Sequence, residues 1–404
     1  MRKFFATLFG ALSTSMGFLV VAPKLNDFLW IPQLLLNEFS WIPTVFGVVG
    51  MILSVVRKPR HYWALVLSVL GISFSTKPFW WIPRTIADQK QSMRRGIGAD
   101  YESKIPPVMF TRMATSYWSL SNTFGGRERN AKVHVSSDIT YSMPGNRPLK
   151  LDVYHPKVAP AVGDRYPAIV CVHGGSWASG DKNDAFTVHH RYLASQGYVV
   201  FAVQYRLSGE AIWPAQMEDV QCAVRWVKHH ADQYDVDAQR VALFGRSAGG
   251  HIALMAAYRA CDPAVKKTCL PDVDANVQSV VAIYPPTDLR LWRSVSWSAV
   301  TALMGGLTHE KPQAYADASP VEFVRDGLPP TLLVQGYMDE LVFPAHAESL
   351  KNRLWCTDTP VVMLRSPWSR HGFDGSLSGL GAQIAQYSID RFLAWSLYGE
   401  SRHE

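Results

Sequence analysis

Ser247 has the surroundings of a serine that could act as a nucleophile. It stands between Gly245 and Gly249 in the stretch GRSAG, directly after the apolar run RVALF. Glycines two residues before and after a serine, on a sharp turn from strand to helix, form the G-x-S-x-G pattern that exposes a reactive hydroxyl. An ordinary glycine-rich turn has the same pattern. The interpretation therefore depends on whether the chain supplies the other groups that the chemistry needs.

A serine hydroxyl attacks a carbonyl when a base takes its proton, and that base is normally a histidine oriented by a carboxylate. His371 follows the predicted strand PVVMLRS, and Asp339 follows the predicted strand PTLLVQG. The chain order Ser, Asp, His, with each residue placed after a strand, is that of α/β-hydrolases. Ser247, Asp339 and His371 are therefore the predicted catalytic triad.

A second glycine pair could stabilise the charge that this attack creates. The sequence HGGSW at 173–177 follows the apolar run YPAIVCV. Glycines there allow backbone N–H groups to face the negative charge that develops on the carbonyl oxygen. Gly174, Gly175 and the amide of Ala248 are the predicted oxyanion-hole donors.

The elements that must position these groups alternate between strands and helices from about residue 131 to 400. The runs YPAIVCV, YVVFAV, RVALFG, SVVAIYP, PTLLVQG and PVVMLRS have the texture of short buried strands, and helical patterns separate most of them. This alternation predicts a mainly parallel sheet covered by helices on both faces, with the chemistry at the carboxyl ends of the strands. The less regular stretch of about 286–328 is predicted to be a cap inserted over the site.

The first 83 residues carry few charges and differ in texture from the rest of the chain. Segments 4–22, 39–56 and 62–83 are predicted to be membrane-spanning helices, and residues 84–130 a basic connector. A signal peptide is the alternative for the first segment. A buried helical hairpin of a soluble protein is the alternative for the region as a whole.

Charges and tryptophans in this region predict an orientation. Arg2, Lys3 and the basic residues at 57–60 mark the cytoplasmic face by the positive-inside rule, and three copies of WIP (30–32, 41–43, 81–83) fall at the opposite face. The protein is therefore predicted to be integral to the cytoplasmic membrane, with its catalytic region on the outer or periplasmic side. Basic residues at 84–95 argue against this orientation. We assign the formal net charge of +7 to topology and lipid headgroups rather than to nucleic acid.

The five cysteines show no spacing typical of a metal site, and the chain has neither a P-loop nor a dinucleotide fingerprint, so no metal or cofactor is predicted. Cys261 and Cys269 bracket a short polar loop, which fits either a disulfide or two free thiols. The pairs His189–His190 and His229–His230 are expected at polar helix surfaces.

Residues 133–398 resemble the α/β-hydrolase superfamily, nearest the hormone-sensitive-lipase-like and the acetyl-esterase or feruloyl-esterase-like carboxylesterases. The motifs that carry the resemblance are LDVYHP, HGGSWASGDK, QYRL, WPAQMEDVQCAVRWV, VDAQRVALFGRSAGGHIAL, YPPTDL, LPPTLLVQGYMDELV and HGF. The resemblance implies the same triad and oxyanion donors, His173 as a support of the oxyanion loop, and Asp219 as a structural acid. The N-terminal spans are not part of the common catalytic pattern.

Ser176 stands where many relatives have glycine, which bears on the shape of the acyl pocket. Ser176 and Trp177, together with Trp292 and Trp297 of the cap, are predicted to line that pocket. The predicted function is a membrane-anchored carboxylic-ester hydrolase that forms an acyl-enzyme on Ser247 and acts on a small-molecule or lipid ester. The alternatives are an acyltransferase that passes the acyl group to a sugar or lipid alcohol, and a non-catalytic membrane protein with a hydrolase-like domain.

Overall fold

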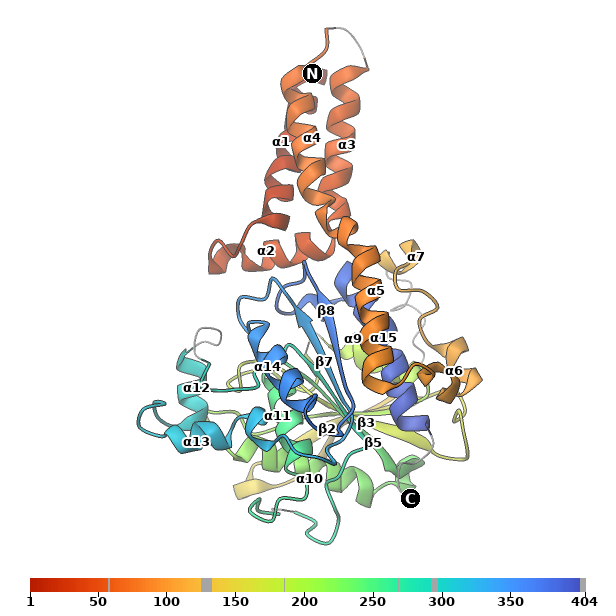
Figure 1. Cartoon of the computed structure of the whole chain (residues 1–404), viewed down its shortest axis with the longest axis vertical. Helices are drawn as coiled ribbons and strands as arrows, with labels where there is room; N and C mark the ends of the chain where they lie inside the picture. The colour runs from red at the N-terminus through yellow and green to blue at the C-terminus, as the bar shows by residue number, and fades with distance from the viewer. Residues whose placement is uncertain (57–58, 125–132, 185, 268, 292–296, 400–404) are drawn as a thin grey trace.

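The computed structural model describes residues 1–56, 59–124, 133–184, 186–267, 269–291 and 297–399. Two parts of the chain differ in shape. A stalk of helices projects from one end of a larger α/β part, and the N-terminus lies at the far tip of the stalk (Figure 1).

The α/β part is built on one eight-stranded sheet. Its strand order is β1-β2-β4-β3-β5-β6-β7-β8, and every pair is parallel except β1–β2 and β2–β4. The mainly parallel sheet predicted from the sequence is confirmed. The strands are β1 (Val133–Ser142), β2 (Leu149–Pro156), β3 (Tyr166–Val172), β4 (Val199–Val203), β5 (Val236–Arg246), β6 (Ser279–Ile283), β7 (Thr331–Gly336) and β8 (Val361–Ser366).

Helices cover both faces of this sheet because its central strands are apolar on both sides. Val170 of β3 belongs to the core beneath α10, α11 and α14, whereas its neighbours Ile169 and Cys171 belong to the core beneath α9 and α15. Alternation of side chains along a strand therefore divides one apolar run between two cores. The helices are α9 (Thr187–Ser195), α10 (Ala215–His229), α11 (Ala248–Tyr258), α14 (Ala345–Leu354) and α15 (Leu380–Tyr398).

The edge of the sheet at β8 is covered by a helix that descends from the stalk. Helix α4 (Tyr62–Ser75) leads into α5 (Lys77–Ile97), which runs alongside the α/β part (Figure 1). Ser92 Oγ donates to the carbonyl of Met363 at 2.8 Å and accepts from its amide at 3.1 Å, so α5 occupies edge groups of β8 that another chain could otherwise pair with.

The predicted third segment, 62–83, ends too early. It covers α4 and the start of α5, and α5 continues to Ile97. The second half of α5 buries a row of residues at helical spacing against the α/β part. Residues 84–97 are therefore part of a packed helix and not of a connector. The remainder of the predicted connector contains three short helices, η1 (Tyr101–Lys104), α6 (Pro107–Arg112) and α7 (Leu120–Thr123), and residues 125–132 lie outside the described residues.

The stalk consists of α1 (Arg2–Val21), α3 (Trp41–Val55) and α4, with α2 (Asp27–Glu38) lying across its base (Figure 1). Among the described residues, two helices, Arg2–Val21 and Tyr62–Ile97, are long and apolar enough to cross a membrane. Helices α2 and α3 are bent by 77° and would supply a third candidate if the pair is one span. The predicted segments 4–22 and 39–56 correspond to α1 and α3, but the sequence patterns did not indicate α2.

Small residues pack inside the stalk, and large apolar residues face outward. Hydroxyl groups join neighbouring helices: Ser13 Oγ donates to the carbonyl of Pro43 at 2.7 Å, and Thr14 Oγ1 to that of Leu67 at 2.6 Å. Apart from Val20 and Pro43, the buried residues are all glycine, alanine or serine: Ala6, Gly10, Ser13, Gly17, Gly47, Gly50, Ser54, Ala64, Ser68, Gly71 and Ser75. The exposed ones include Phe4, Leu8, Leu12, Phe18, Val45, Val48, Ile52, Val55, Val66, Val69 and Leu70.

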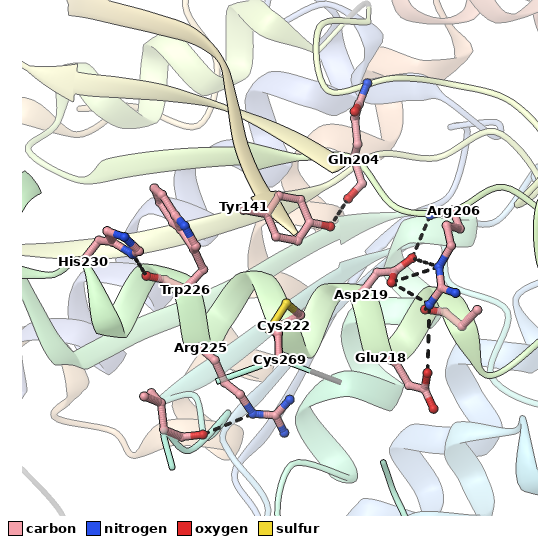
Figure 2. The surroundings of a disulfide bond; sticks show 12 residues. Tyr141, Gln204, Arg206, Glu218, Asp219, Cys222, Arg225, Trp226, His230 and Cys269 are labelled. Atoms are coloured by element: carbon pink, nitrogen blue, oxygen red, sulfur yellow. Dashed lines mark hydrogen bonds and ion pairs between the residues drawn. A yellow bond between two sulfur atoms is a disulfide. The ribbon is translucent and has the colours of Figure 1, made fainter. Parts of the chain in front are cut away.

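The disulfide joins a different pair of cysteines from the predicted one. Cys269 is bonded to Cys222 of α10, with their Cα atoms 5.6 Å apart, whereas Cys261 is a free, exposed thiol (Figure 2). Neither alternative left open for Cys261 and Cys269 is correct, because α10 packs beside α11, and the loop after α11 brings Cys269 back over α10. Asp219, one helical turn before Cys222, is buried and fixed by Arg206, whose Nη2 lies 2.8 Å from Oδ1 (Figure 2).

The stretch predicted as a cap contains α12 (Trp297–Met304), α13 (Pro312–Asp317) and η4 (Pro320–Phe323). Its apolar residues Val300, Leu303 and Tyr315 join the core beneath α10 and α11. The carbonyl of Leu303 accepts a hydrogen bond from the amide of Trp213 at 2.9 Å. This stretch is thus packed firmly against the α/β part. Trp292 lies outside the described residues.

Candidate active site

Ser247 lies on the tight turn between β5 and α11. Its φ of 53° and ψ of −123° are unusual for a residue with a Cβ and hold its side chain at the turn, where it is half-buried. A Cβ on Gly245 would collide with the carbonyl of Gly249, and one on Gly249 with the carbonyl oxygens of Val172 and His173. Both glycines of the pattern are therefore required by close backbone approach.

The structure brings the three predicted catalytic side chains into one hydrogen-bonded chain. His371 Nε2 lies 3.0 Å from Ser247 Oγ, and His371 Nδ1 lies 2.8 Å from Asp339 Oδ2. The other oxygen of Asp339 accepts from the amides of Leu341 at 2.9 Å and Val342 at 2.8 Å. The buried carboxylate is therefore fixed by its own loop and aimed at the imidazole.

This arrangement determines which nitrogen of His371 carries a proton. A carboxylate only accepts hydrogen bonds, so Nδ1 donates to Asp339, and Nε2 keeps the lone pair that can accept the proton of Ser247. The ring of Tyr284 packs against the imidazole with centroids 4.4 Å apart and limits its rotation. The geometry is that of a serine activated by an oriented general base.

Two of the predicted oxyanion donors, Gly174 and Ala248, lie beside the serine. A Cβ on Gly174 would lie 3.4 Å from Ser247 Cβ, and Ala248 is the first residue of α11. Gly175 has a φ of +114°, which favours glycine, and its carbonyl accepts from the amides of Ala178 and Ser179, each at 3.0 Å. The loop is thus a fixed turn that holds Gly174 next to the nucleophile.

His173 stabilises the glycine loop that contains Gly174 and Gly175. Its Nδ1 hydrogen-bonds to the carbonyl of Gly174 at 2.7 Å, and its ring stacks on Tyr205 with centroids 4.3 Å apart. Burial lowers the pKa of the His173 imidazole below its usual value, so the ring stays neutral. These contacts agree with a supporting role rather than with a second base.

The two residues after the glycines have different positions. Ser176 is half-buried on the loop at a φ of +53°, whereas Trp177 is fully buried in the core. The indole N–H of Trp177 donates to His251 Nδ1 at 3.2 Å. Trp177 is therefore a core residue that anchors the loop, contrary to the prediction that it lines the pocket, because its indole packs against His251 inside the core.

A buried ion pair between the serine and histidine loops was not predicted. Arg246, which precedes Ser247, donates from Nε to Asp374 Oδ2 at 2.5 Å, and the hydroxyl of Tyr284 donates to Oδ1 of the same carboxylate at 2.5 Å. Burial alone would raise the pKa of Asp374, but the guanidinium and this hydroxyl hold it below its usual value. The sequence signal that could have predicted this ion pair was a charged residue inside each catalytic motif, Arg246 in GRSAGG and Asp374 in HGFDG.

His189 and His190 are also buried, although the sequence predicted surface positions for them. His189 Nε2 hydrogen-bonds to the carbonyl of Asp374 at 2.5 Å. Burial, together with the charge of Arg246, lowers the pKa of His189 to about 3, so this ring is neutral. The prediction failed because α9 lies between the sheet and the Asp374 loop. His229 is exposed, as expected.

The described residues contain no group of three or more His, Cys, Asp or Glu side chains placed to hold a metal ion. The sheet, the strained serine turn and the Ser–His–Asp chain define the class of the protein, which is an α/β-hydrolase. Within that class the chain belongs to the BD-FAE family, whose model matches residues 151–354, just over half of the chain.

Curated relatives agree with this membership. The chain is 30% identical over 263 residues to the probable carboxylic ester hydrolase LipM of Mycobacterium tuberculosis, a match that covers 64% of this chain and 60% of LipM. It is 30% identical over 253 residues to the esterase LipC of the same organism, covering 60% of this chain and 61% of LipC. The chain thus spans less than two thirds of the length of these relatives.

Solved structures show the same fold. An esterase from Thermogutta terrifontis, Est2 with propionate bound, superposes with a TM-score of 0.54 at 25% identity and covers 69% of this chain and 99% of Est2. A truncated carbohydrate esterase from gut microbiota has a TM-score of 0.55 at 23% identity, covering 64% of this chain and 95% of that protein. The resemblance to the carboxylesterases expected from the sequence motifs is confirmed.

Proposed function

We propose that this protein is a membrane-anchored serine hydrolase of carboxylic esters. The observation that carries the proposal is the continuous chain Asp339–His371–Ser247, with a contact of 3.0 Å between the imidazole and the serine hydroxyl, and with Gly174 beside the serine. The names of the relatives, all hydrolases or esterases, support hydrolysis rather than acyl transfer.

The reaction would proceed in two halves through an acyl-enzyme. Ser247 Oγ bonds to the ester carbonyl carbon while His371 Nε2 takes its proton, and the oxyanion faces the amides of Gly174, Gly175 and Ala248. His371 then gives the proton to the departing alcohol as the ester C–O bond breaks. Water repeats the sequence: His371 takes one of its protons, the hydroxide bonds to the acyl carbon, and Ser247 leaves with the proton returned.

Covalent labelling tests this proposal directly. A fluorophosphonate should label the wild-type chain and fail to label Ser247→Ala, and the variant should lose hydrolysis of a short p-nitrophenyl ester by a factor of about 10⁴ or more. Retention of a tenth of the wild-type rate would remove Ser247 from the mechanism. Adding sugar or lipid alcohols to the assay separates transfer from hydrolysis, since acylated alcohol appears only if transfer competes with water.

The packing of the stalk supports a membrane anchor. Lipid tails are as apolar as leucine, so helices in a bilayer associate through small residues and interhelical hydrogen bonds rather than through burial of large side chains. The described stalk buries glycine, alanine and serine, joins its helices through Ser13 and Thr14, and exposes large apolar residues. A hairpin folded in water would bury the opposite set.

The charges at the tip of the stalk support an orientation with the α/β part outside the cytoplasm. Arg2 donates to the carbonyl of Pro59 at 3.0 Å, so the basic N-terminus lies beside Pro59 and Arg60 at the end far from the catalytic residues. The disulfide Cys222–Cys269 fits an oxidising compartment.

Reporter fusions after Gly126 test this orientation. A reporter that works only in the periplasm should be active there, and one that works only in the cytoplasm should be silent. Cytoplasmic activity would mean an inward-facing α/β part and would contradict the orientation, while leaving the assignment of Ser247 untouched.

A further inference from the structure

Helix α2 buries the polar residues of its second half, Gln33, Asn37 and Glu38, and exposes a row of apolar residues. Gln33 Nε2 donates to the carbonyl of Pro23 at 2.9 Å, and Asn37 Nδ2 to that of Val20 at 2.9 Å, so both amides are turned inward. Phe28, Ile31 and Leu35, at helical spacing, form a row that is exposed by 88%, 56% and 52%. In water this row would be costly to expose, but it suits a helix that lies in the surface of a bilayer.

The same helix rests on the loop that carries the catalytic histidine. Glu38 accepts from Ser369 Oγ at 2.9 Å and from the amide of Gly381 at 2.6 Å. A Cβ on Gly372, next to His371, would lie 3.7 Å from Leu34 of α2. Helix α2 therefore touches the loop of the general base.

The connection between α1 and α2 contacts the loops of both the acid and the base. Arg370, fully buried, donates to the carbonyl of Ala22 and lies 2.5 Å from Glu340, which in turn accepts from the amide of Lys24 at 3.0 Å. Glu340 and Arg370 are the immediate neighbours of Asp339 and His371. The catalytic loops thus lie at the end of the α/β part to which the stalk is attached (Figure 1).

The base of the stalk defines the level at which α2 would lie in a membrane. Thr44 near the start of α3 hydrogen-bonds to Ser75 at the end of α4 at 2.7 Å, so both helix ends meet at the level of α2. The three WIP copies fall in α2, at the start of α3 and near the start of α5, and tryptophan concentrates at the interface between membrane and water. If α1, α3 and α4 cross the bilayer, α2 lies in its surface.

We propose that α2 is a bilayer-surface helix through which the active site draws its substrate from the membrane, and that the substrate is an amphiphilic ester embedded in that membrane, such as an acylglycerol. This inference rests on the proposed ester hydrolase function and on the membrane anchor. An acyl ester of this kind holds its carbonyl at the level of the headgroups and its chain in the apolar layer. Ser247 would meet the carbonyl at the boundary that α2 occupies, and the fatty acid and the alcohol would be the products.

Two substrates presented to the same preparation test the inference. The full-length protein is reconstituted in phosphatidylcholine vesicles containing dioleoylglycerol, and release of oleate is compared with hydrolysis of dissolved p-nitrophenyl acetate. The triple variant Phe28→Ser, Ile31→Ser, Leu35→Ser should lower the rate on dioleoylglycerol about tenfold relative to the rate on p-nitrophenyl acetate, equivalent to about 1.4 kcal/mol of lost apolar contact. The single variant Phe28→Ser should lower that ratio by a smaller factor.

A matched control changes exposed apolar residues outside the stalk. Val158→Ser with Val162→Ser, on the loop between β2 and β3, should leave the ratio of the two rates unaltered. Fluorophosphonate labelling of each variant reports whether the site is intact, and the single variant is the test if the triple variant fails to fold.

The outcomes separate this inference from the function on which it rests. Wild-type protein that hydrolyses p-nitrophenyl acetate but not dioleoylglycerol overturns the inference and leaves the esterase standing. Equal losses on both substrates, or no loss on either, also overturn it, because α2 would then be structural or irrelevant. Wild-type protein that hydrolyses neither ester contradicts the proposed function itself.

Discussion

The stalk and the α/β part bury opposite kinds of residue. Every residue of strand β3 is buried, and its side chains include Tyr166, Ile169 and Val170, as expected of a core that forms in water. The stalk is held by contacts such as Gly71 against Ser13, and its large apolar side chains point outward. This contrast is the one expected if the stalk lies in a bilayer, as proposed above, and the predictions below test the two sets of contacts separately.

The two parts meet where the chemistry lies. The contacts of Glu38 with Ser369 and of Ala22 with Arg370 join the base of the stalk to the loop of His371. A membrane anchor alone requires only a tether. The observed contacts go further, because they join the stalk directly to the loop of the general base.

The largest effect is expected where the α/β part performs chemistry. Asp339→Asn should lower kcat by a factor of about 10³–10⁴, because the imidazole loses the acceptor that fixes its tautomer. Glu340→Gln is the matched control: this neighbouring acid contacts Arg370 and Lys24 rather than His371, so a fall of less than about tenfold is expected. Initial rates on a short p-nitrophenyl ester measure both, and a more damaging Glu340→Gln would reverse the assignment of the acid.

The second effect concerns the buried ion pair that links the serine and histidine loops. Arg246→Met leaves the Asp374 carboxylate buried without its cation, which typically costs about 3–5 kcal/mol of unfolding free energy. Adding Asp374→Leu removes the stranded charge and should restore part of the loss. Thermal inactivation of detergent-solubilised protein measures both variants. A double variant less stable than Arg246→Met alone would show that the pair acts through packing rather than charge.

The third effect distinguishes the observed disulfide from the predicted one. Replacing Cys222 and Cys269 with serine should cost about 2–4 kcal/mol, since the unfolded chain gains freedom. Cys261→Ser should change stability little because that thiol is exposed and unbridged. Unfolding midpoints with and without reductant give the comparison. If the Cys261→Ser variant lost its sensitivity to reductant, Cys261 would be part of the disulfide, and the observed Cys222–Cys269 pairing would be wrong.

The sequence was informative where function depends on local order along the chain. Strand ends are readable from apolar runs, so Ser247, Asp339 and His371 could be placed on turns at the same edge of the sheet. Partners that depend on how helices pack against one another could not be read in this way. The contacts of Cys222, Asp374 and His189 depend on the tertiary positions of α9, α10 and the loop of His371, which apolar runs do not reveal.

The stalk shows the same division. Long uncharged segments predicted α1 and α3, because length and lack of charge are properties of the sequence alone. The third apolar segment was predicted to end at residue 83, yet α5 continues through Pro83 to Ile97 because its packing against β8 stabilises the helix. Helix α2 was missed because its polar residues are buried only through their partners on α1 and on the loop of His371, which the sequence pattern does not show.

The smallest effect should be confined to the stalk. A Cβ on Gly71 would lie 2.5 Å from the backbone carbonyl carbon of Ser13, so Gly71→Leu forces α1 and α4 apart, and overpacking of this kind typically costs about 1–3 kcal/mol. Val69→Leu, on the exposed side of the same helix, adds a methylene that faces outward and should cost nothing measurable. Stability of the full-length protein in detergent, measured together with fluorophosphonate labelling at low temperature, distinguishes the two. Gly71→Leu should lower the unfolding midpoint and leave labelling of Ser247 intact. Equal tolerance of both changes would mean that the small residues of the stalk are not its packing surface, and the contrast between the two parts of the molecule would lose its physical basis.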